Sequence, residues 1–439
     1  MSAPLARIRS LRSVSRELWL IYALKILESF VYFSSTLNLT RYLRVHFHCS
    51  DVLAGTLYGV WGVLISAYGL LCSPLIDALG VRRSLLLGGV VCTLGRLLFA
   101  VATTRARALF ALFTLIPFGQ ALGIPVLTIA VQRVTDDQTR SVAFSAFYTC
   151  MNIGALFAGL FTDAFLTGKS PEHALVALYT VNAIVGIFYT FLAVLFFREL
   201  PVVVDKQSGW FSRVRALLTD RIFWRVLVFS VSLFGARTIF RHIDTTLPAW
   251  MLRTIGPNAH YGDVYAINPT IVILGTVPFH AFLADYDLYA LFVVGTTLSA
   301  LAPLLLALMT PSYGAAVLFM LAMTAGEVVY SPKLYEFIML LAPPGQEALF
   351  SALASLPLFF VKLLTGASSG ELLQTYCPVH PPRQCQRMWG MISAGAWTTP
   401  LLLLGLHRFL YTPDVRARIA ARRKGKSVEE LRLESVIDD

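Results

Sequence analysis

The chain has 439 residues, of which 56% are hydrophobic and only 14% are charged. A soluble domain carries roughly 25% charged residues, so this composition excludes an ordinary soluble globular enzyme. The formal net charge of +11 invites a nucleic-acid interpretation. However, the basic residues gather in short stretches beside apolar runs, as in the cytoplasmic loops of membrane proteins. We therefore expect the lipid bilayer, and no nucleic acid, as a partner.

Apolar runs long enough to span a bilayer, which takes about 20 residues, fill nearly the whole chain. They predict twelve transmembrane helices, at 18–43, 53–79, 82–102, 107–133, 142–167, 174–198, 222–253, 261–285, 287–309, 313–342, 347–373 and 388–411. An even number of spans leaves both termini on one side, and the basic stretches make that side the cytoplasm. The sequence thus predicts an all-α membrane protein.

The two halves of the chain carry similar segments in the same order. GQALGIP (119–125) matches GEVVYSP (326–332), FSAF (144–147) matches FSAL (350–353), and LID (75–77) matches LAD (283–285). Duplicated units are typical of transporters that rock two halves about a central site. We expect an N-terminal six-helix half over 1–198, a cytoplasmic linker with an interfacial helix over 199–221, a C-terminal six-helix half over 222–411 and a basic cytoplasmic tail over 412–439.

The segment DALGVRR (77–83) joins the second and third expected spans. An acid, a turn glycine and paired arginines can latch neighbouring spans together; a short loop that follows the positive-inside rule is the alternative. The segment resembles the signature of the major facilitator superfamily, with matching residues at Asp77, Gly80, Arg82 and Arg83. This resemblance implies two six-helix halves and a secondary active transporter.

A narrower likeness lies in TRSVAFSAFYTCMNIGAL (139–156). It is similar to the F-Y-x-x-x-N-x-G signature of the proton-dependent oligopeptide transporter family, with matches at Phe147, Tyr148, Asn152 and Gly154. LESFVYF (27–33), INP (267–269) and GEVVYSP also resemble that family. The resemblance implies proton coupling at Glu28 and an ammonium site formed by Asn268 and Glu327.

Ionisable side chains inside apolar spans are costly and usually face a bundle interior or an aqueous cavity. In the first span, Lys25, Glu28 and Tyr32 fall on one helix face, and Lys25 and Glu28 are spaced to pair. We predict proton coupling by Glu28 and Lys25 and solute contact by Tyr32; an inert intrahelical pair is the alternative. Protons are the expected coupling ion, and we expect no cofactor and no metal.

Further candidates for solute binding lie in the fourth, fifth, eighth and tenth spans. Glu327 has Gln120 as its repeat counterpart, and a lone buried acid must be paired, protonated or bound to a ligand. We predict solute binding by Glu327, Asn268, Tyr148 and Gln120, with Glu327 also in proton coupling. The alternative is a purely structural role, which for Tyr148 means packing.

The seventh span is unusually polar and reads RTIFRHIDTTLP over 237–248. Arg237 and Arg241 are candidates to bind an anionic group, and Arg241 with Asp244 is spaced to close a gate against the first span. His242 is a further solute-binding candidate that titrates near neutral pH when solvated. A satisfied packing histidine is the alternative.

This chain differs from the oligopeptide transporter family at positions where family members carry a lysine or an arginine. The lysine that family members carry before the proline of the fourth span is Ile124 here, and two arginines of the first span are replaced by Ser29 and Thr36. The ammonium side of the family's site is thus retained and its carboxylate side is lost. A cation from the first or seventh span is a candidate replacement, whereas Arg96 and Lys362 are expected to snorkel or to form structural pairs.

Two cysteines, Cys377 and Cys385, lie in a loop that the topology places on the non-cytoplasmic side. A disulfide joins them if that face is oxidising; two free thiols are the alternative.

These observations favour a proton-coupled secondary transporter that moves a small polar nitrogenous solute, such as a peptide, amino acid or amine, by alternating access. A carrier of nitrate or another small anion is one alternative, and a non-transporting receptor or scaffold is another. The sequence has no phosphate loop and no nucleophile–base motif, so we do not expect an enzyme. We expect a monomeric transport unit in the plasma membrane or an endolysosomal membrane, with a small-molecule solute as its partner.

Overall fold

The computed structural model describes residues 16–135, 139–199, 215, 217–283, 286–341 and 356–423, and these residues are helical, with no strand among them. Eight helices of this described part are long and apolar enough to cross a membrane, or nine if the bent pair α10–α11 forms one span. The described helices correspond in order to the twelve expected spans, some of which are broken into pieces, except for a helix over Pro413–Arg423 in the expected tail. Most of the expected linker, the start of the eleventh span and the end of the basic tail lie outside the described residues.

The helices before the linker form one group. They are α2 (Arg16–Phe47), α3 (Asp51–Leu71), α4 (Ser73–Ala100), α5 (Arg105–Phe110), the π turn η2 (Ala111–Leu115), α6 (Ile116–Val134), α7 (Arg140–Leu166) and α8 (Pro171–Phe196). Within this N-terminal group, α2 packs on α7 and α8, and α4 packs on α6 and α8.

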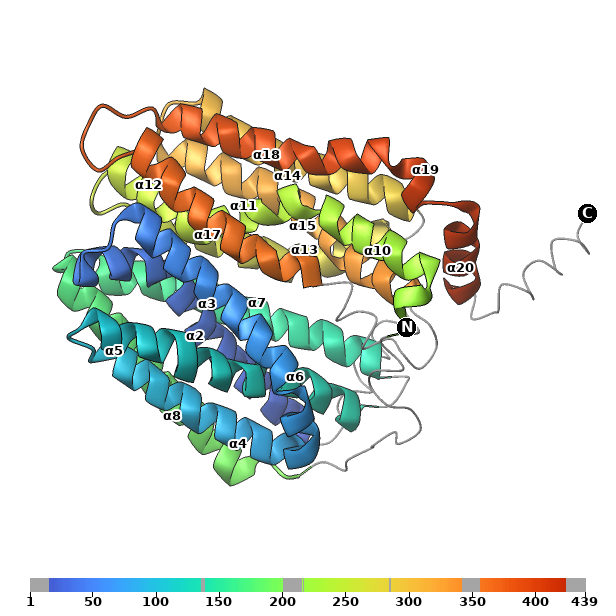
Figure 1. Ribbon diagram of the computed structural model, residues 1–439, viewed down its shortest axis with the longest axis horizontal. Coiled ribbons are helices and arrows are strands. Elements are labelled where there is room, and N and C mark those ends of the chain that lie inside the picture. Colours follow the sequence, from blue (N-terminus) through green and yellow to red (C-terminus); the bar gives the residue numbers. More distant parts are fainter. Residues whose placement is uncertain are drawn as a thin grey trace, which may run out of the picture.

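The helices after the linker form a second group beside the first (Figure 1). They are α10 (Arg221–Ser232), α11 (Phe234–Thr245), α12 (Leu247–Thr254), α13 (Tyr261–Phe282), α14 (Leu288–Leu308), α15 (Tyr313–Leu341), α17 (Leu356–Tyr376), α18 (Cys385–Gly405), α19 (His407–Leu410) and α20 (Pro413–Arg423). Within this C-terminal group, α14 packs on α15 and α18, and α11 packs on α17 and α18.

The fourth and seventh expected spans are not continuous α-helices. In the fourth, the π turn η2 ends at Leu115, two residues before Pro117, which lacks the N–H that a regular α-helix uses there. The seventh is divided into α10, α11 and α12, with a bend of 43° between the first two. Helix α12 begins at Leu247 with Pro248 in its first turn, because this proline cannot continue the hydrogen bonds of α11.

The two groups meet along α3 with α17 and along α7 with α13, and α2 also contacts α11. Glycines allow the first contact to be close: a Cβ atom added at Gly55 would collide with the carbonyl oxygen of Gly366. At the second contact, a Cβ atom at Gly159 would collide with the carbonyl oxygen of Gly262. Small residues let helix backbones approach in this way, so the interface between the groups lies on these two seams.

Candidate functional site

A short polar contact within the C-terminal group joins α13 and α15. Asn268 Nδ2 donates hydrogen bonds to Glu327 Oε2 at 2.6 Å and to Thr324 Oγ1 at 3.1 Å. Both members of the pair remain partly exposed, and Arg237 and Arg241 of α11 interact electrostatically with the Glu327 carboxylate. The structure therefore brings together the two residues that the sequence assigned to an ammonium site.

The predicted pair of the first span is also formed. Lys25 Nζ lies 2.9 Å from Glu28 Oε2, and both side chains are buried in α2. The ammonium group of Lys25 also lies 5.2 Å from the ring centroid of Phe147 on α7, close enough for a cation–π contact. Tyr148, the neighbouring candidate, is partly buried, and its carbonyl oxygen accepts a hydrogen bond from Asn152 Nδ2 at 3.0 Å.

A small cavity lies beside Glu28 inside the N-terminal group, and we call it the Glu28 cavity. Its polar lining residues are Glu28, Arg96, Gln120 and Tyr189. It offers about 20 Å³ to the centre of a water molecule, which is room for about one water. Gln120 Oε1 and the Tyr189 hydroxyl have no hydrogen-bond partner among the described residues. Gln120, a predicted solute contact and the repeat counterpart of Glu327, therefore lies beside Glu28. Arg96 is buried here and does not snorkel.

The polar residues of the seventh span have separate environments. Arg241 Nη1 lies 3.1 Å from Asp244 Oδ2, and the same carboxylate oxygen accepts a 2.9 Å hydrogen bond from the hydroxyl of Tyr58 on α3. Asp244 therefore contacts the N-terminal group through α3. His242 is buried and its Nδ1 lies 2.7 Å from Thr246 Oγ1, which is the environment of a satisfied packing histidine. Arg237 stacks over the ring of Tyr330 at 5.8 Å.

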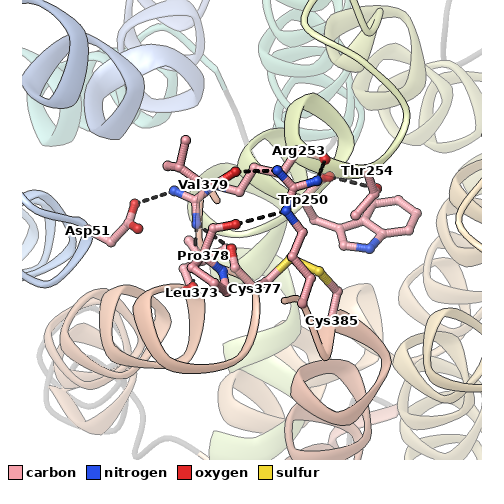
Figure 2. The surroundings of a disulfide bond; sticks show 10 residues. Asp51, Trp250, Arg253, Thr254, Leu373, Cys377, Pro378, Val379 and Cys385 are labelled. Atoms are coloured by element: carbon pink, nitrogen blue, oxygen red, sulfur yellow. Dashed lines mark hydrogen bonds and ion pairs between the residues drawn. A yellow bond between two sulfur atoms is a disulfide. The ribbon is translucent and has the colours of Figure 1, made fainter. Parts of the chain in front are cut away.

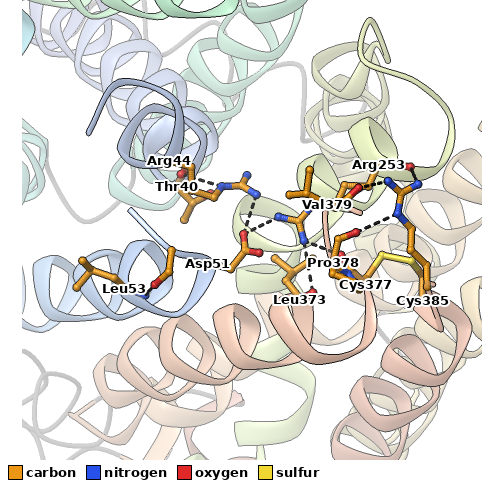
Figure 3. Close-up of polar contacts among 12 residues, drawn as sticks. Thr40, Arg44, Asp51, Leu53, Arg253, Leu373, Cys377, Pro378, Val379 and Cys385 are labelled. Carbon is orange, nitrogen blue, oxygen red and sulfur yellow. Dashed lines mark hydrogen bonds and ion pairs between the residues drawn. A yellow bond between two sulfur atoms is a disulfide. The ribbon is translucent and has the colours of Figure 1, made fainter. Parts of the chain in front are cut away.

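A second set of charges joins the two groups where α2 leads into α3. Asp51 Oδ1 lies 2.9 Å from Arg44 Nη1 of α2 and 2.5 Å from Arg253 Nη2 of α12 (Figure 3). We call this three-residue cluster the Asp51 clamp. All three side chains are largely buried, with exposed fractions of 10% for Asp51, 17% for Arg44 and 6% for Arg253.

The disulfide loop supports the clamp from the C-terminal group. Cys377 and Cys385 form a disulfide, and Arg253 Nη1 donates to the carbonyl oxygen of Cys377 at 2.6 Å (Figure 2). Arg383 of the same loop donates hydrogen bonds to the carbonyl oxygens of Pro378 and Arg253. The loop that the disulfide closes thus supplies one acceptor for Arg253, whose Nη2 atom binds Asp51 of the N-terminal group.

Two further contacts join the groups near this end. Tyr261 of α13 donates to Asn38 Oδ1 at 2.6 Å and accepts from Arg41 Nη1 at 3.0 Å. Asp163 of α7 accepts a 2.7 Å hydrogen bond from the backbone N–H of Asp263. The described contacts therefore hold α2, α3 and α7 against α11, α12 and α13 at this end of the bundle.

Asp163, His260 and Asp263 place atoms that can bind a metal ion within 4.8 Å of one another. Asp163 is engaged by the start of α13, and His260 Nδ1 lies 3.1 Å from Asp263 Oδ2. These contacts explain the cluster without a metal ion: Asp163 caps the start of α13, and His260 and Asp263 form an exposed pair beside it.

In the expected latch, Gly80 interrupts α4 with a φ of +78°, a conformation that favours glycine. Arg82 Nε donates to the carbonyl oxygen of Phe197 at 2.8 Å, and the Arg82 N–H donates to Glu199 Oε1 at 3.2 Å. Arg82 therefore ties α4 to the end of α8. The Asp77 side chain lies outside the described residues, and Arg83 is exposed.

Sequence reasoning missed Tyr58 and the Asp51 clamp, and it treated Lys362 only as a residue that snorkels or forms a structural pair. Lys362 Nζ of α17 donates a hydrogen bond to the hydroxyl of Tyr32 on α2. It also lies 4.9 Å from the ring centroid of Trp61 and 6.0 Å from that of Tyr58. The one available signal was an isolated lysine in an apolar run, which the sequence alone could not separate from a snorkelling residue.

Known proteins resemble this chain along most of its length. A family model described as Major Facilitator Superfamily matches residues 18–362. An uncharacterized MFS-type transporter of Bacillus subtilis (strain 168), YqjV, is 22% identical over 234 residues, which are 52% of this chain and 55% of that protein. The match thus spans about half the length of this relative.

Solved structures share the fold at low sequence identity. A POT family transporter in complex with 5-aminolevulinic acid has a TM-score of 0.73 at 16% identity, with 90% of this chain and 97% of that chain covered. The nucleoside transporter NupG has a TM-score of 0.73 at 15% identity, with 89% of this chain and 100% of that chain covered. The predicted superfamily fold is confirmed, and the chain belongs to the Major Facilitator Superfamily.

Proposed function

We propose that this chain is a proton-coupled secondary transporter for a small polar nitrogenous solute, namely a peptide, amino acid or amine. The two helix groups would move about the central residues by alternating access. The contact between Asn268 and Glu327 carries the proposal, because it presents a carboxylate and an amide oxygen from two helices of one group. A carboxylate held in this way is suited to accept an ammonium group.

Neutralising Glu327 is expected to lower solute uptake by about 10- to 100-fold, since hydrogen bonds to charged groups contribute about 1.5–3 kcal/mol. The variant is Glu327→Gln, which keeps the size of the side chain and its hydrogen bond to Asn268 while removing the negative charge. Uptake of dipeptides, amino acids, amines and nitrate by purified protein in liposomes measures the effect.

The matched control is Glu371→Gln on α17, which removes a carboxylate from an exposed position and should leave uptake unchanged. Wild-type uptake of an amine or peptide that persists in Glu327→Gln contradicts the ammonium site. Uptake of nitrate alone would favour the anion carrier. That alternative has weaker support, because the charge of Arg241 is balanced by Asp244 and His242 is buried beside Thr246.

Proton coupling is proposed for the pair Lys25–Glu28 because of its position beside a cavity. The Glu28 carboxylate faces the Lys25 ammonium group and the Ser29 hydroxyl on its own helix, and Arg96 and Tyr189 line the cavity next to it. A water molecule in that cavity would give the carboxylate a route for proton exchange. Protonation of Glu28 would release Lys25 and so change a buried charge pair between conformations.

Glu28→Gln is therefore expected to abolish the dependence of uptake on an imposed pH gradient, while exchange of solute across the membrane at equal pH continues. Glu17→Gln, which alters the first turn of the same helix, is the matched control and should keep the gradient dependence. The measurement is the accumulation ratio in liposomes with and without the gradient. Gradient-driven accumulation by Glu28→Gln at the wild-type level would remove Glu28 from the coupling step.

A further inference from the structure

Lys362 is a cation of the C-terminal group that is surrounded by aromatic rings of the N-terminal group. Its Nζ atom lies 5.0 Å from the ring centroid of Tyr32, 4.9 Å from that of Trp61 and 6.0 Å from that of Tyr58. Its stem passes over Gly62, where an added Cβ atom would collide with the lysine side chain. The groove that holds Lys362 is thus built from α2 and α3, across the interface between the two groups.

This lysine makes no ion pair with any described residue. Lys25 and Arg241, the comparable cations on inner helices, each face a carboxylate at 2.9 Å and 3.1 Å. The carboxylate of Asp244 interacts electrostatically with Lys362, but its oxygen already receives Arg241 and the Tyr58 hydroxyl. A partly buried charge without its own counter-ion is costly, so the site favours an anionic ligand.

Further hydrogen-bond donors lie around the lysine. The indole nitrogen of Trp61 is buried, with 1% of the residue exposed, and has no hydrogen-bond partner among the described residues. An indole nitrogen can only donate, as can the two ammonium hydrogens of Lys362 that do not bind the Tyr32 hydroxyl. The donors therefore outnumber the acceptors, as in a site for a carboxylate.

We propose that Lys362, with Trp61 and Tyr32, binds the carboxylate of the solute whose ammonium group binds Glu327. This inference rests on the proposed function and adds the substrate class: the solute is zwitterionic. Arg241 interacts electrostatically with Glu327 and also with Tyr32, so both subsites lie around one central arginine. Lys362 supplies from α17 the positive charge that the fourth and first spans lack.

The test compares acids with their amides, in which a neutral amide of similar size replaces the carboxylate. L-Alanine is paired with L-alaninamide, and L-alanyl-L-alanine is paired with its C-terminal amide. Binding to the purified full chain is measured by calorimetry, because uptake of compounds of different net charge would respond differently to a membrane potential. We expect the wild type to bind at least one acid about tenfold or more tightly than its amide.

Lys362→Met is expected to bring that ratio close to one by weakening the acid alone, and Lys362→Arg should keep the preference for the acid. Trp61→Phe keeps the ring and removes the donor, so it should lower the ratio about threefold. The matched control is Lys169→Met, which removes a lysine that also lies over a ring, that of Phe165 at 4.2 Å, but in an exposed position. It should leave the ratio unchanged.

Each outcome separates the two proposals. A wild type that binds acid and amide equally, or a Lys362→Met protein that keeps the wild-type ratio, overturns the carboxylate subsite and leaves the proposed function standing. A wild type that binds none of the four compounds overturns both. If Lys362→Met does not fold, Trp61→Phe decides, and an unchanged ratio in that variant overturns the subsite.

Discussion

Replacing Asp51 by asparagine is expected to lower the free energy of unfolding by about 3–5 kcal/mol and to loosen the contact between the two helix groups. One carboxylate oxygen of Asp51 serves both Arg44 and Arg253, so the substitution leaves two largely buried guanidinium groups without a counter-ion. Removing one partner of a buried charge cluster costs about this much. The Asp51 clamp is thus expected to be the largest single polar contribution to closing this end of the bundle.

Cys49 offers a native reporter for the clamp. It lies in the loop between α2 and α3 with only 6% exposed, and burial raises the pKa of its thiol, which slows its reaction with maleimides because the thiolate is the reactive form. Arg44 and Asp51 join the two helices on either side of this loop. Asp51→Asn should therefore increase the labelling rate of Cys49, with Cys49→Ser as the background measurement.

Two controls separate the clamp from a general loss of charge. Glu172→Gln breaks the pair with His46, in which Glu172 is 55% exposed, and should change stability by at most about 1 kcal/mol. The double variant Asp51→Asn with Arg253→Gln removes an arginine together with its counter-ion and should be more stable than Asp51→Asn alone. Equal thermal unfolding midpoints for Asp51→Asn and the wild type would show that the clamp contributes nothing.

Local patterns were sufficient to predict the helices and the pairs within one helix. Hydrophobic length located the spans, and i, i+3 spacing predicted Lys25 with Glu28 and Arg241 with Asp244, because these partners share a helix face. The pair Asn268–Glu327 came from family resemblance, since nothing in the local sequence places α13 beside α15. The breaks in the fourth and seventh spans were missed, although Pro117 and Pro248 mark them.

Contacts between the two groups could not be predicted, because they depend on how distant helices meet. Asp51 follows a short loop at the start of α3, which in sequence is an ordinary place for an acid at a helix N-terminus. Its partner Arg253 lies 202 residues away. The hydrogen-bond partner of Lys362 is the hydroxyl of Tyr32, which is 330 residues away in the sequence. The roles of Asp51 and Lys362 therefore depend on contacts between the two helix groups, and a single sequence does not reveal these contacts.

Those seams depend on glycine, and a single added methyl group is expected to force one of them apart. In Gly55→Ala, the new Cβ atom would collide with the carbonyl oxygen of Gly366 and lie 3.2 Å from the backbone nitrogen of Gly370 on α17. Backbone atoms cannot rotate away as a side chain can, so α3 and α17 must separate. Overpacking of this kind costs about 1–3 kcal/mol and sometimes more.

The same helix supplies the matched control. A Cβ atom at Gly69 of α3 meets nothing within 4 Å, so Gly69→Ala should be neutral or stabilising by up to about 1 kcal/mol through the better helix propensity of alanine. Gly55→Ala is thus expected to lower the thermal unfolding midpoint, whereas Gly69→Ala should leave it unchanged or raise it. Gly55→Ala should also speed the labelling of Cys49, because α3 carries Asp51 away from Arg253 as it moves. If both alanines had the same effect, helix propensity and not the contact with α17 would govern this position, and the close seam would have no role in holding the two groups together.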